Sequence, residues 1–80
     1  MPDLHVLTSG QQPADPDNNI IMTEVVRPGS EKEYTITVLI DRKPVSVGGP
    51  FVSLDEAFQE AAEEARHYAL TPIYLRREQF

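Results

Sequence analysis

A serine and a histidine within hydrogen-bonding distance form the nucleophile and base of many hydrolases, and Ser53 and His67 are the pair to test first. Both fall in one predicted helix, where a separation of fourteen residues corresponds to about 21 Å along the axis. They cannot share a proton. The run Ser53-Leu54-Asp55-Glu56 instead matches a capping box, in which the serine hydroxyl accepts a hydrogen bond from the Glu56 amide. We interpret Ser53 as a helix cap, and we predict no catalytic residue in this chain.

Carboxylates and histidines are the other side chains here that could carry out acid/base chemistry or bind a metal. Four glutamates gather on the predicted helix: Glu56, Glu60, Glu63 and Glu64. They fall on its outward side, where a solvated acidic surface is the expected role. His67 follows Glu63 by four residues, which is an ordinary helix-surface contact. His5 lies in a short terminal piece. With two histidines and no cysteine, we expect no metal site and no cofactor.

Two further segments have a superficial likeness to ligand-binding loops. Asp15–Asn19 begins like a calcium loop, but Ile20 stands where the loop needs glycine and Val26 where it needs glutamate. Gly48-Gly49-Pro50 is not followed by Lys-Ser or Lys-Thr, and its proline has no N–H to offer a phosphate. We interpret the first segment as a solvated turn-rich linker and the second as a tight bend before Phe51.

The strands that would position these residues are predicted over residues 20–26, 34–40 and 43–47. In the middle stretch the alternation predicts a core face made of Tyr34, Ile36, Val38 and Ile40. The opposite, half-polar face is Thr35, Thr37 and Leu39. After a turn at Asp41-Arg42, or a slightly longer turn, we place Val45, Val47 and Phe51 in the core. Pro44 cannot donate a hydrogen bond to a neighbouring strand, so we expect the third strand to lie near an edge or to begin at the proline.

One amphipathic helix is predicted to follow the cap at Ser53 and to end before Thr71-Pro72. Its predicted inward face is Leu54, Phe58, Ala61, Ala62 and Ala65. Acidic residues at its start and basic residues near its end favour the helix dipole. The apolar segment 73–75 comes next. We expect it to pair with a sheet edge, either strand 20–26 or 34–40 of the same chain or a strand of a second chain.

These elements predict an α+β fold, namely a small antiparallel sheet of three to four strands with one amphipathic helix packed on one face. Residues 20–80 are predicted as the single domain, and residues 1–19 as an N-terminal piece with a flexible loop. Within that piece, Leu4–Thr8 is an apolar stretch for which a strand and a sticky end stay open. Ser9–Asn19 has little to bury, and we expect it to be mobile with fast amide exchange.

The run from Glu33 to Val45, followed by Gly48–Phe58 and the alanine- and glutamate-rich helix, resembles the small uncharacterised bacterial proteins built from a β-hairpin and one helix. The resemblance covers Tyr34 to about Tyr74. It implies an α+β fold in which one helix lies on a sheet. Because such families have no assigned chemistry, it implies no activity, cofactor or site residue.

Composition limits the function further. A chain of 80 residues makes one small domain of marginal stability, which a partner subunit would raise. The absence of cysteine excludes disulfides, thiolate zinc sites and cysteine nucleophiles. No secretory leader and no long apolar run stand out, so we expect a soluble, cytoplasmic protein without a membrane partner. The net charge of −6 repels nucleic acid at long range.

We therefore expect a non-enzymatic protein-interaction module, in its simplest form a homodimer, that uses the face of Thr35, Thr37 and Leu39 together with an uncovered edge strand. Two alternatives stay open. One is an acidic inhibitor whose helix mimics the charge of nucleic acid. The other is a weak nucleic-acid binder that uses basic and aromatic side chains. The candidate residues for that contact are Arg42, Lys43, Tyr74, Arg76 and Arg77.

Overall fold

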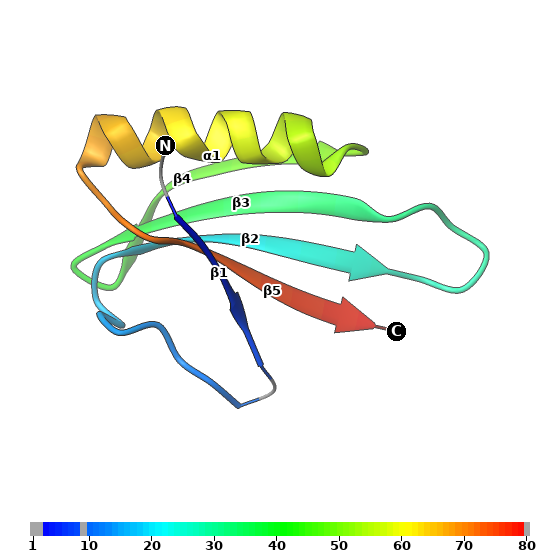
Figure 1. The fold of residues 1–80 in the computed structure, drawn as a ribbon, viewed down its shortest axis with the longest axis horizontal. Coiled ribbons are helices and arrows are strands. Elements are labelled where there is room, and N and C mark those ends of the chain that lie inside the picture. Colours follow the sequence, from blue (N-terminus) through cyan, green and yellow to red (C-terminus); the bar gives the residue numbers. More distant parts are fainter. Residues whose placement is uncertain (1–2, 9, 80) are drawn as a thin grey trace.

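The computed structural model describes residues 3–8 and 10–79. Within them, five strands and one helix follow one another along the chain in the order β1, β2, β3, β4, α1, β5 (Figure 1). Their bounds are β1 Leu4–Leu7, β2 Asn19–Val26, β3 Glu33–Ile40, β4 Lys43–Phe51, α1 Leu54–Tyr68 and β5 Ile73–Gln79. The structure is thus α+β with one helix, and the apolar piece at the N-terminus is a strand.

The sheet has five strands in the order β1-β5-β2-β3-β4 and is mixed. β5 runs parallel to both of its neighbours, β1 and β2, while β3 runs antiparallel to both β2 and β4. The predicted antiparallel sheet of three to four strands was therefore wrong in strand number and direction. Parallel strands in one sheet must be joined by a long crossover connection. A sequence pattern reveals such a connection when it forms a helix. The crossover from β1 to β2 is irregular chain, so it leaves no such pattern.

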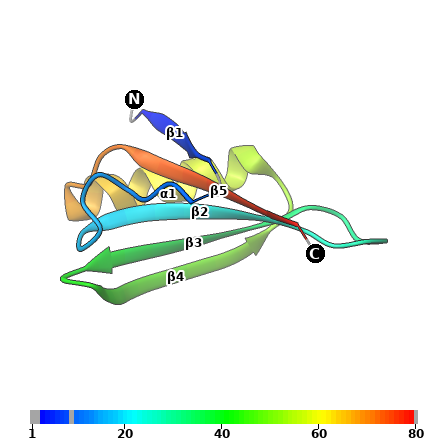
Figure 2. The same ribbon diagram turned by 90° about the horizontal axis from the view of Figure 1, so that it is seen from below.

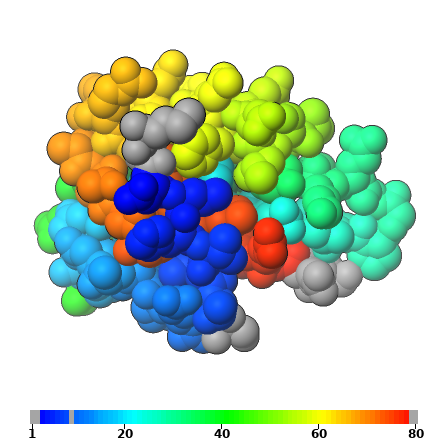
Figure 3. Space-filling view, in the orientation of Figure 1, coloured from blue at the N-terminus to red at the C-terminus, as the bar shows by residue number. Residues whose placement is uncertain are grey.

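The two crossovers lie on opposite faces of the sheet (Figure 2). α1 joins β4 to β5 over one face, and residues 10–18 of the connection from β1 to β2 lie over the other. On that second side the Ala14 amide donates to the Tyr74 hydroxyl (3.1 Å). β5 is thus covered on both faces, and Ile73, Tyr74 and Leu75 are all buried. Figure 3 shows the blue N-terminal residues lying over the orange strand β5. The expected pairing of segment 73–75 is confirmed, and it occurs within the chain.

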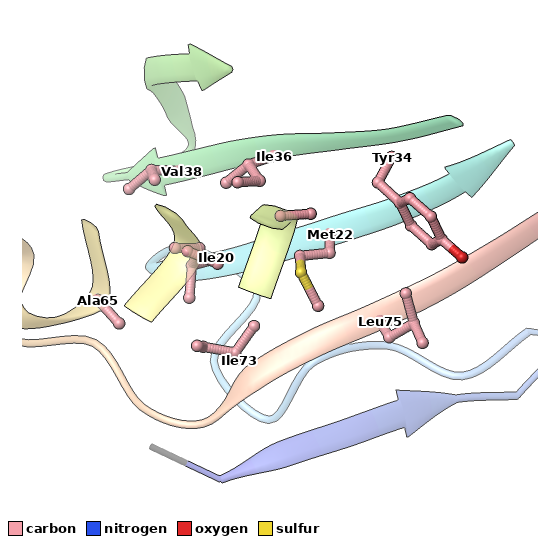
Figure 4. Close-up of a cluster of buried hydrophobic side chains, with 10 residues drawn as sticks. Ile20, Met22, Tyr34, Ile36, Val38, Ala65, Ile73 and Leu75 are labelled. Atoms are coloured by element: carbon pink, nitrogen blue, oxygen red, sulfur yellow. The ribbon is translucent and has the colours of Figure 1, made fainter. Parts of the chain in front are cut away.

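The core lies between α1 and the strands beneath it. The helix begins where the sequence predicted. Ser53 is the N-cap, with its hydroxyl 3.5 Å from the Glu56 amide that it accepts from. Three alanines spaced four residues apart are buried against the sheet: Ala57, Ala61 and Ala65. They pack with Ile20, Met22, Tyr34, Ile36, Val38, Ile73 and Leu75 (Figure 4). Small helix side chains permit this close approach of backbone to sheet.

Leu54 was placed in the core, but it is 37% exposed. Its angle around the helix axis matches that of the buried alanines. Because it is the first residue of α1, it lies at the end of the core rather than over it. Phe58 and Ala62 are partly buried at the margin of the core. The predicted helix phase is right, and the predicted length of its buried stripe is too long at the N-terminal end.

The predicted inward positions of Val45 and Val47 were wrong, since these side chains are 46% and 71% exposed. Val47 pairs with Thr37, on the face away from α1, whereas Ser46 and Gly48 pair with the core residues Val38 and Ile36. A register shift between Val38 and Leu39 places an extra residue in β4 and resets its alternation. β4 is an edge strand, as Pro44 predicted, and so its apolar residues need not face the core.

The segment 15–19 is fastened to the turn between β3 and β4. Asp41 and Arg42 both have positive φ, 54° and 66°, as a two-residue hairpin turn requires. The Arg42 amide donates to the Asp17 carbonyl (2.8 Å), and the Asp41 amide donates to the Asn18 side chain (3.0 Å). The Arg42 guanidinium also pairs with the Asp17 carboxylate. These contacts hold one end of the crossover segment against the sheet.

The calcium-like run at Asp15 uses its oxygen atoms within the chain. The Asp15 carboxylate accepts the amides of Asp17 (3.0 Å) and Asn18 (3.2 Å). The hydrogen bond from the Asp17 amide lowers the pKa of Asp15. The run is therefore a local turn. Fast amide exchange across Ser9–Asn19 stays a prediction. Ser9, the first residue of that stretch, lies outside the described residues.

The tight contact between α1 and the sheet is tested by enlarging a buried alanine. Replacing Ala61→Leu inserts a side chain where none fits, so we expect the free energy of unfolding to fall by about 2 kcal/mol. Gln59→Leu adds the same residue at an exposed position and should change it by less than about 0.5 kcal/mol. Urea unfolding followed by circular dichroism measures both. Equal stability of the two variants would contradict the packing described.

Candidate binding surface

The helix is narrower than the sheet that it covers. An α-helix is about 10 Å wide with its side chains, which spans roughly two strands at 4.8 Å spacing. The core residues beneath α1 come chiefly from β2 and β3, with β5 beside them. The two edge strands, β1 and β4, therefore extend beyond the helix. Most large exposed apolar side chains of the described residues lie on these edges: Leu4 and Val6 on β1, and Val45 and Val47 on β4.

A groove of about 390 Å³ runs between the β4 edge and α1. The groove exists because the β4 residues that face the helix are small: Gly48 pairs with the buried Ile36 and leaves it as part of the groove lining. Phe51 forms one wall, and Glu60 and Glu64 of α1 form the other. The complete lining is Ile36, Ser46, Val47, Gly48, Gly49, Phe51, Glu60 and Glu64.

The two glycines in this groove differ in what they require. Gly49 has φ +103°, and a Cβ there would lie 2.7 Å from the Tyr34 carbonyl oxygen, so only glycine fits. At Gly48 the nearest atom to an added Cβ is Phe51 Cε2 at 3.9 Å, which is ordinary contact. The backbone at position 48 would therefore accept a side chain. The groove is open at Gly48 although the local conformation does not demand a glycine.

A stripe of three glutamates, Glu56, Glu60 and Glu64, follows α1 at four-residue spacing and contributes two members to the groove. Like charges at this spacing destabilise a helix by a few tenths of a kcal/mol per pair. Among residues 3–8 and 10–79, the ion pairs are Arg27–Glu33, Arg42–Asp17 and Arg77–Glu24, and none of them includes the stripe. The negative charge above β4 thus has no cationic partner in this part of the chain.

A second polar cluster lies within the sheet. Glu24 on β2 pairs in register with Tyr34 on β3 and Arg77 on β5. The Tyr34 hydroxyl donates to Glu24 Oε2 (3.1 Å), and Arg77 Nε lies 3.7 Å from Glu24 Oε1. Burial raises the pKa of Tyr34, and the hydrogen bond to the Glu24 carboxylate raises it further. These contacts compensate the burial of a carboxylate at the end of the core, which is a structural role.

The basic residues predicted as a nucleic-acid contact are not brought together. Arg42 and Lys43 lie at the β3–β4 turn, and Arg76 and Arg77 lie toward the C-terminal end of β5, at the opposite end of the sheet (Figure 1). Arg42 is paired with Asp17, and Arg77 with Glu24.

Tyr74, the aromatic member of that set, is buried. Its hydroxyl accepts a hydrogen bond from the Ala14 amide, and its ring meets His5 edge-on, with the ring centroids 6.2 Å apart. Stacking on a base would require the crossover segment to move away first.

The groups considered for catalysis and metal binding are separate in space. Ser53 caps α1, while His67 near the other end packs its ring edge-on against Tyr68 (4.7 Å). The described residues contain no group of three or more His, Cys, Asp or Glu side chains arranged to hold a metal ion. In the same residues, no helix has both the length and the apolar character needed to cross a membrane.

A scan of protein-family models and searches of curated proteins and of solved structures found no match to this chain. The likeness to proteins built from a hairpin and one helix therefore rests on the sequence pattern alone.

Sequence reasoning missed the groove, although two signals for it are present. The glutamates were interpreted as a general acidic surface, while the four-residue spacing of Glu56, Glu60 and Glu64 selects one stripe of the helix. In β4, the alternate small residues Ser46 and Gly48 mark the side facing α1. The exposure of Val47 between them depends on the register shift, for which the sequence carries no distinct mark.

The polar cluster predicts how stability depends on alkaline pH. Because the pKa of Tyr34 is raised above its ordinary value of 10.0 in the folded protein, the unfolded chain loses this proton first as pH rises. The contribution of the Tyr34 proton to the free energy of unfolding is fully present below about pH 10 and is lost as the pH rises above that value. Urea unfolding between about pH 8 and 11 should show a steeper decline for the wild-type protein than for Tyr34→Phe. Parallel declines would show that Tyr34 does not titrate in this way.

Proposed function

We propose that this chain is a non-enzymatic protein-interaction module that binds its partner by adding a strand to the free edge of β4. The supporting observation is that β4, nine residues long, ends the sheet, so alternate residues direct their N–H and C=O groups away from β3. Such an edge pairs readily with an extended segment of another chain. The separation of Ser53 from His67 and the role of Ser53 as a cap support the non-enzymatic part.

β4 is favoured over the other uncovered surfaces. β1, the opposite edge, has only four residues. The sheet face with Thr35, Thr37 and Leu39, which we expected to mediate a homodimer, lies away from α1 and is half-buried. Val47 extends this face onto β4, because it pairs with Thr37. A strand added to β4 would thus contact both the backbone edge and the end of this face.

The prolines of β4 limit how much of the edge can pair. Pro44 near its start and Pro50 near its end have no N–H to donate. The stretch between them, Val45–Gly49, is about 17 Å long at the usual rise per residue. Backbone pairing over so short a distance gives little affinity alone, so side chains beside the edge must supply the rest.

The nucleic-acid alternatives receive less support. A phosphate backbone would meet two separate pairs of cations, one member of each already neutralised by Asp17 or Glu24. Mimicry of nucleic acid by α1 is compatible with the glutamate stripe, but it gives no role to the open edge of β4. Strand addition uses this edge.

Strand addition can be tested without assuming the partner. Short random peptides displayed on phage are selected on the wild-type protein, and the winners are titrated into ¹⁵N-labelled protein. We expect the largest amide shifts at Val45–Gly49 and at the paired residues of β3. Each winner is then made with N-methyl groups on alternate amides, in two sets offset by one residue. One set should abolish binding and the other, the matched control, should not.

Equal binding by both methylated sets would contradict strand addition, because only one set of amides in an added strand faces β4. Failure to enrich any peptide would contradict the proposal as well. So would amide shifts confined to a surface other than β4.

A further inference from the structure

We infer that the strand recognised by β4 alternates basic and apolar residues, with its lysine or arginine side chains paired to Glu60 and Glu64. This inference rests on the proposed strand addition and specifies the chemistry of its partner. Three features carry it: the groove between β4 and α1, the unpaired glutamates above it, and the exposed valine on the other side of the same strand.

The alternation follows from the two sides of β4. Successive residues of an added strand would point to opposite faces of the sheet, next to the β4 side chains on the same face. On the α1 face these neighbours are Ser46 and Gly48, below the glutamates. On the other face the neighbour is Val47, which is 71% exposed. A partner residue therefore meets carboxylates on one side and an apolar surface on the other.

The charge of the groove specifies the residues on the α1 side. Glu60 and Glu64 form no ion pair with any described residue, and an added strand would remove water from them. Burying a carboxylate without a counter-charge is costly, so neutral or acidic partner side chains at this position oppose binding. A cationic side chain compensates the cost of burying the carboxylates and reduces the repulsion between the glutamates of the stripe. Arginine can hold a carboxylate through two parallel hydrogen bonds. The net charge of −6 also accelerates the approach of a basic segment.

The shape of the groove suits long side chains. Because Gly48 adds no side chain, the methylene stem of a lysine or arginine can lie against Ile36 and Phe51 in the groove. Its charged end then reaches the carboxylates of α1. A short polar side chain would contact less of the apolar lining than a lysine or arginine, and it would extend less far toward the glutamates.

A second copy of this chain fits the groove less well than a basic segment. The β4 strand of a second copy offers one lysine, Lys43, on its α1 side, where it pairs in register with Ile40. Antiparallel pairing of two β4 strands about a two-fold axis places both helices on the same face. Both glutamate stripes and a further charge of −6 would then face one another. Charge complementarity thus favours a different, basic partner.

The test uses two synthetic peptides of identical composition. One alternates lysine and valine, and the other carries the same residues in two blocks. In ¹⁵N-detected titrations, the alternating peptide should shift the amides of Val45–Gly49 and bind about tenfold more tightly than the block peptide, since only alternation places every lysine on one face. An alternating glutamate and valine peptide should not bind.

Protein variants locate the contact. Glu60→Gln with Glu64→Gln should weaken the alternating lysine peptide about tenfold or more. Glu31→Gln with Glu63→Gln makes the same change in net charge outside the groove lining and is the matched control. Gly48→Val fills the groove at a position where a Cβ has room, so it should leave the melting temperature unchanged or raised and abolish peptide binding.

Equal losses of affinity in the two double variants would mean attraction by net charge alone and would overturn the inference. So would unchanged binding by a folded Gly48→Val protein, or equal binding of the alternating and block peptides. If unbiased selection yields peptides that add to β4 without basic residues, the inference fails and strand addition stands. Concentration-dependent doubling of mass with shifts at β4 would identify a second copy as the occupant. Absence of any β4 shift would refute both proposals.

Discussion

One helix has to cover a sheet of five strands, and this mismatch of widths governs the remainder of the structure. α1 is about as wide as two strands, and its buried alanines bring it close to β2 and β3. A helix with larger inward residues would stand further from the sheet. The close approach therefore gives a dense but narrow core. Both edges of the sheet are left outside it.

The two edges meet this constraint differently. At the β1 side, the crossover segment 10–18 passes over β5 and is held there by hydrogen bonds between Ala14 and Tyr74 and between Asp17 and Arg42. It covers the outer face of β5, and pairing with β1 and β2 makes β5 an interior strand although it comes last in the chain. At the β4 side, no segment of the described residues other than α1 crosses the sheet. The small residues of β4 face the helix, and its valines face solvent. Glutamates of α1 line the groove between the helix and β4. The binding proposals concern the edge that the fold leaves open.

The elements formed by neighbouring residues could be predicted from sequence, and those fixed by distant contacts could not. The Ser53 cap, the alanine stripe of α1 and the hairpin at Asp41-Arg42 each follow from residues a few positions apart. The edge position of β4 followed from Pro44. The parallel pairing of β1 with β5 depends instead on contact between strands that are separated by most of the chain. The exposure of Val45 and Val47 depends on a register shift within β4. For the same reason, the glutamates of α1 could be identified in the sequence, but their position beside an open sheet edge could not be predicted.

The main features of this sheet are that β4 is an open edge and that β5 is an interior strand covered on both faces. Residue-resolved amide hydrogen exchange of the dilute protein tests this most directly. The account predicts slow exchange throughout the paired amides of β2 and β5. Along Val45–Gly49 it predicts alternation, in which amides bonded to β3 are protected and those directed outward exchange rapidly. Uniform protection along β4, or rapid exchange in β5, would contradict it.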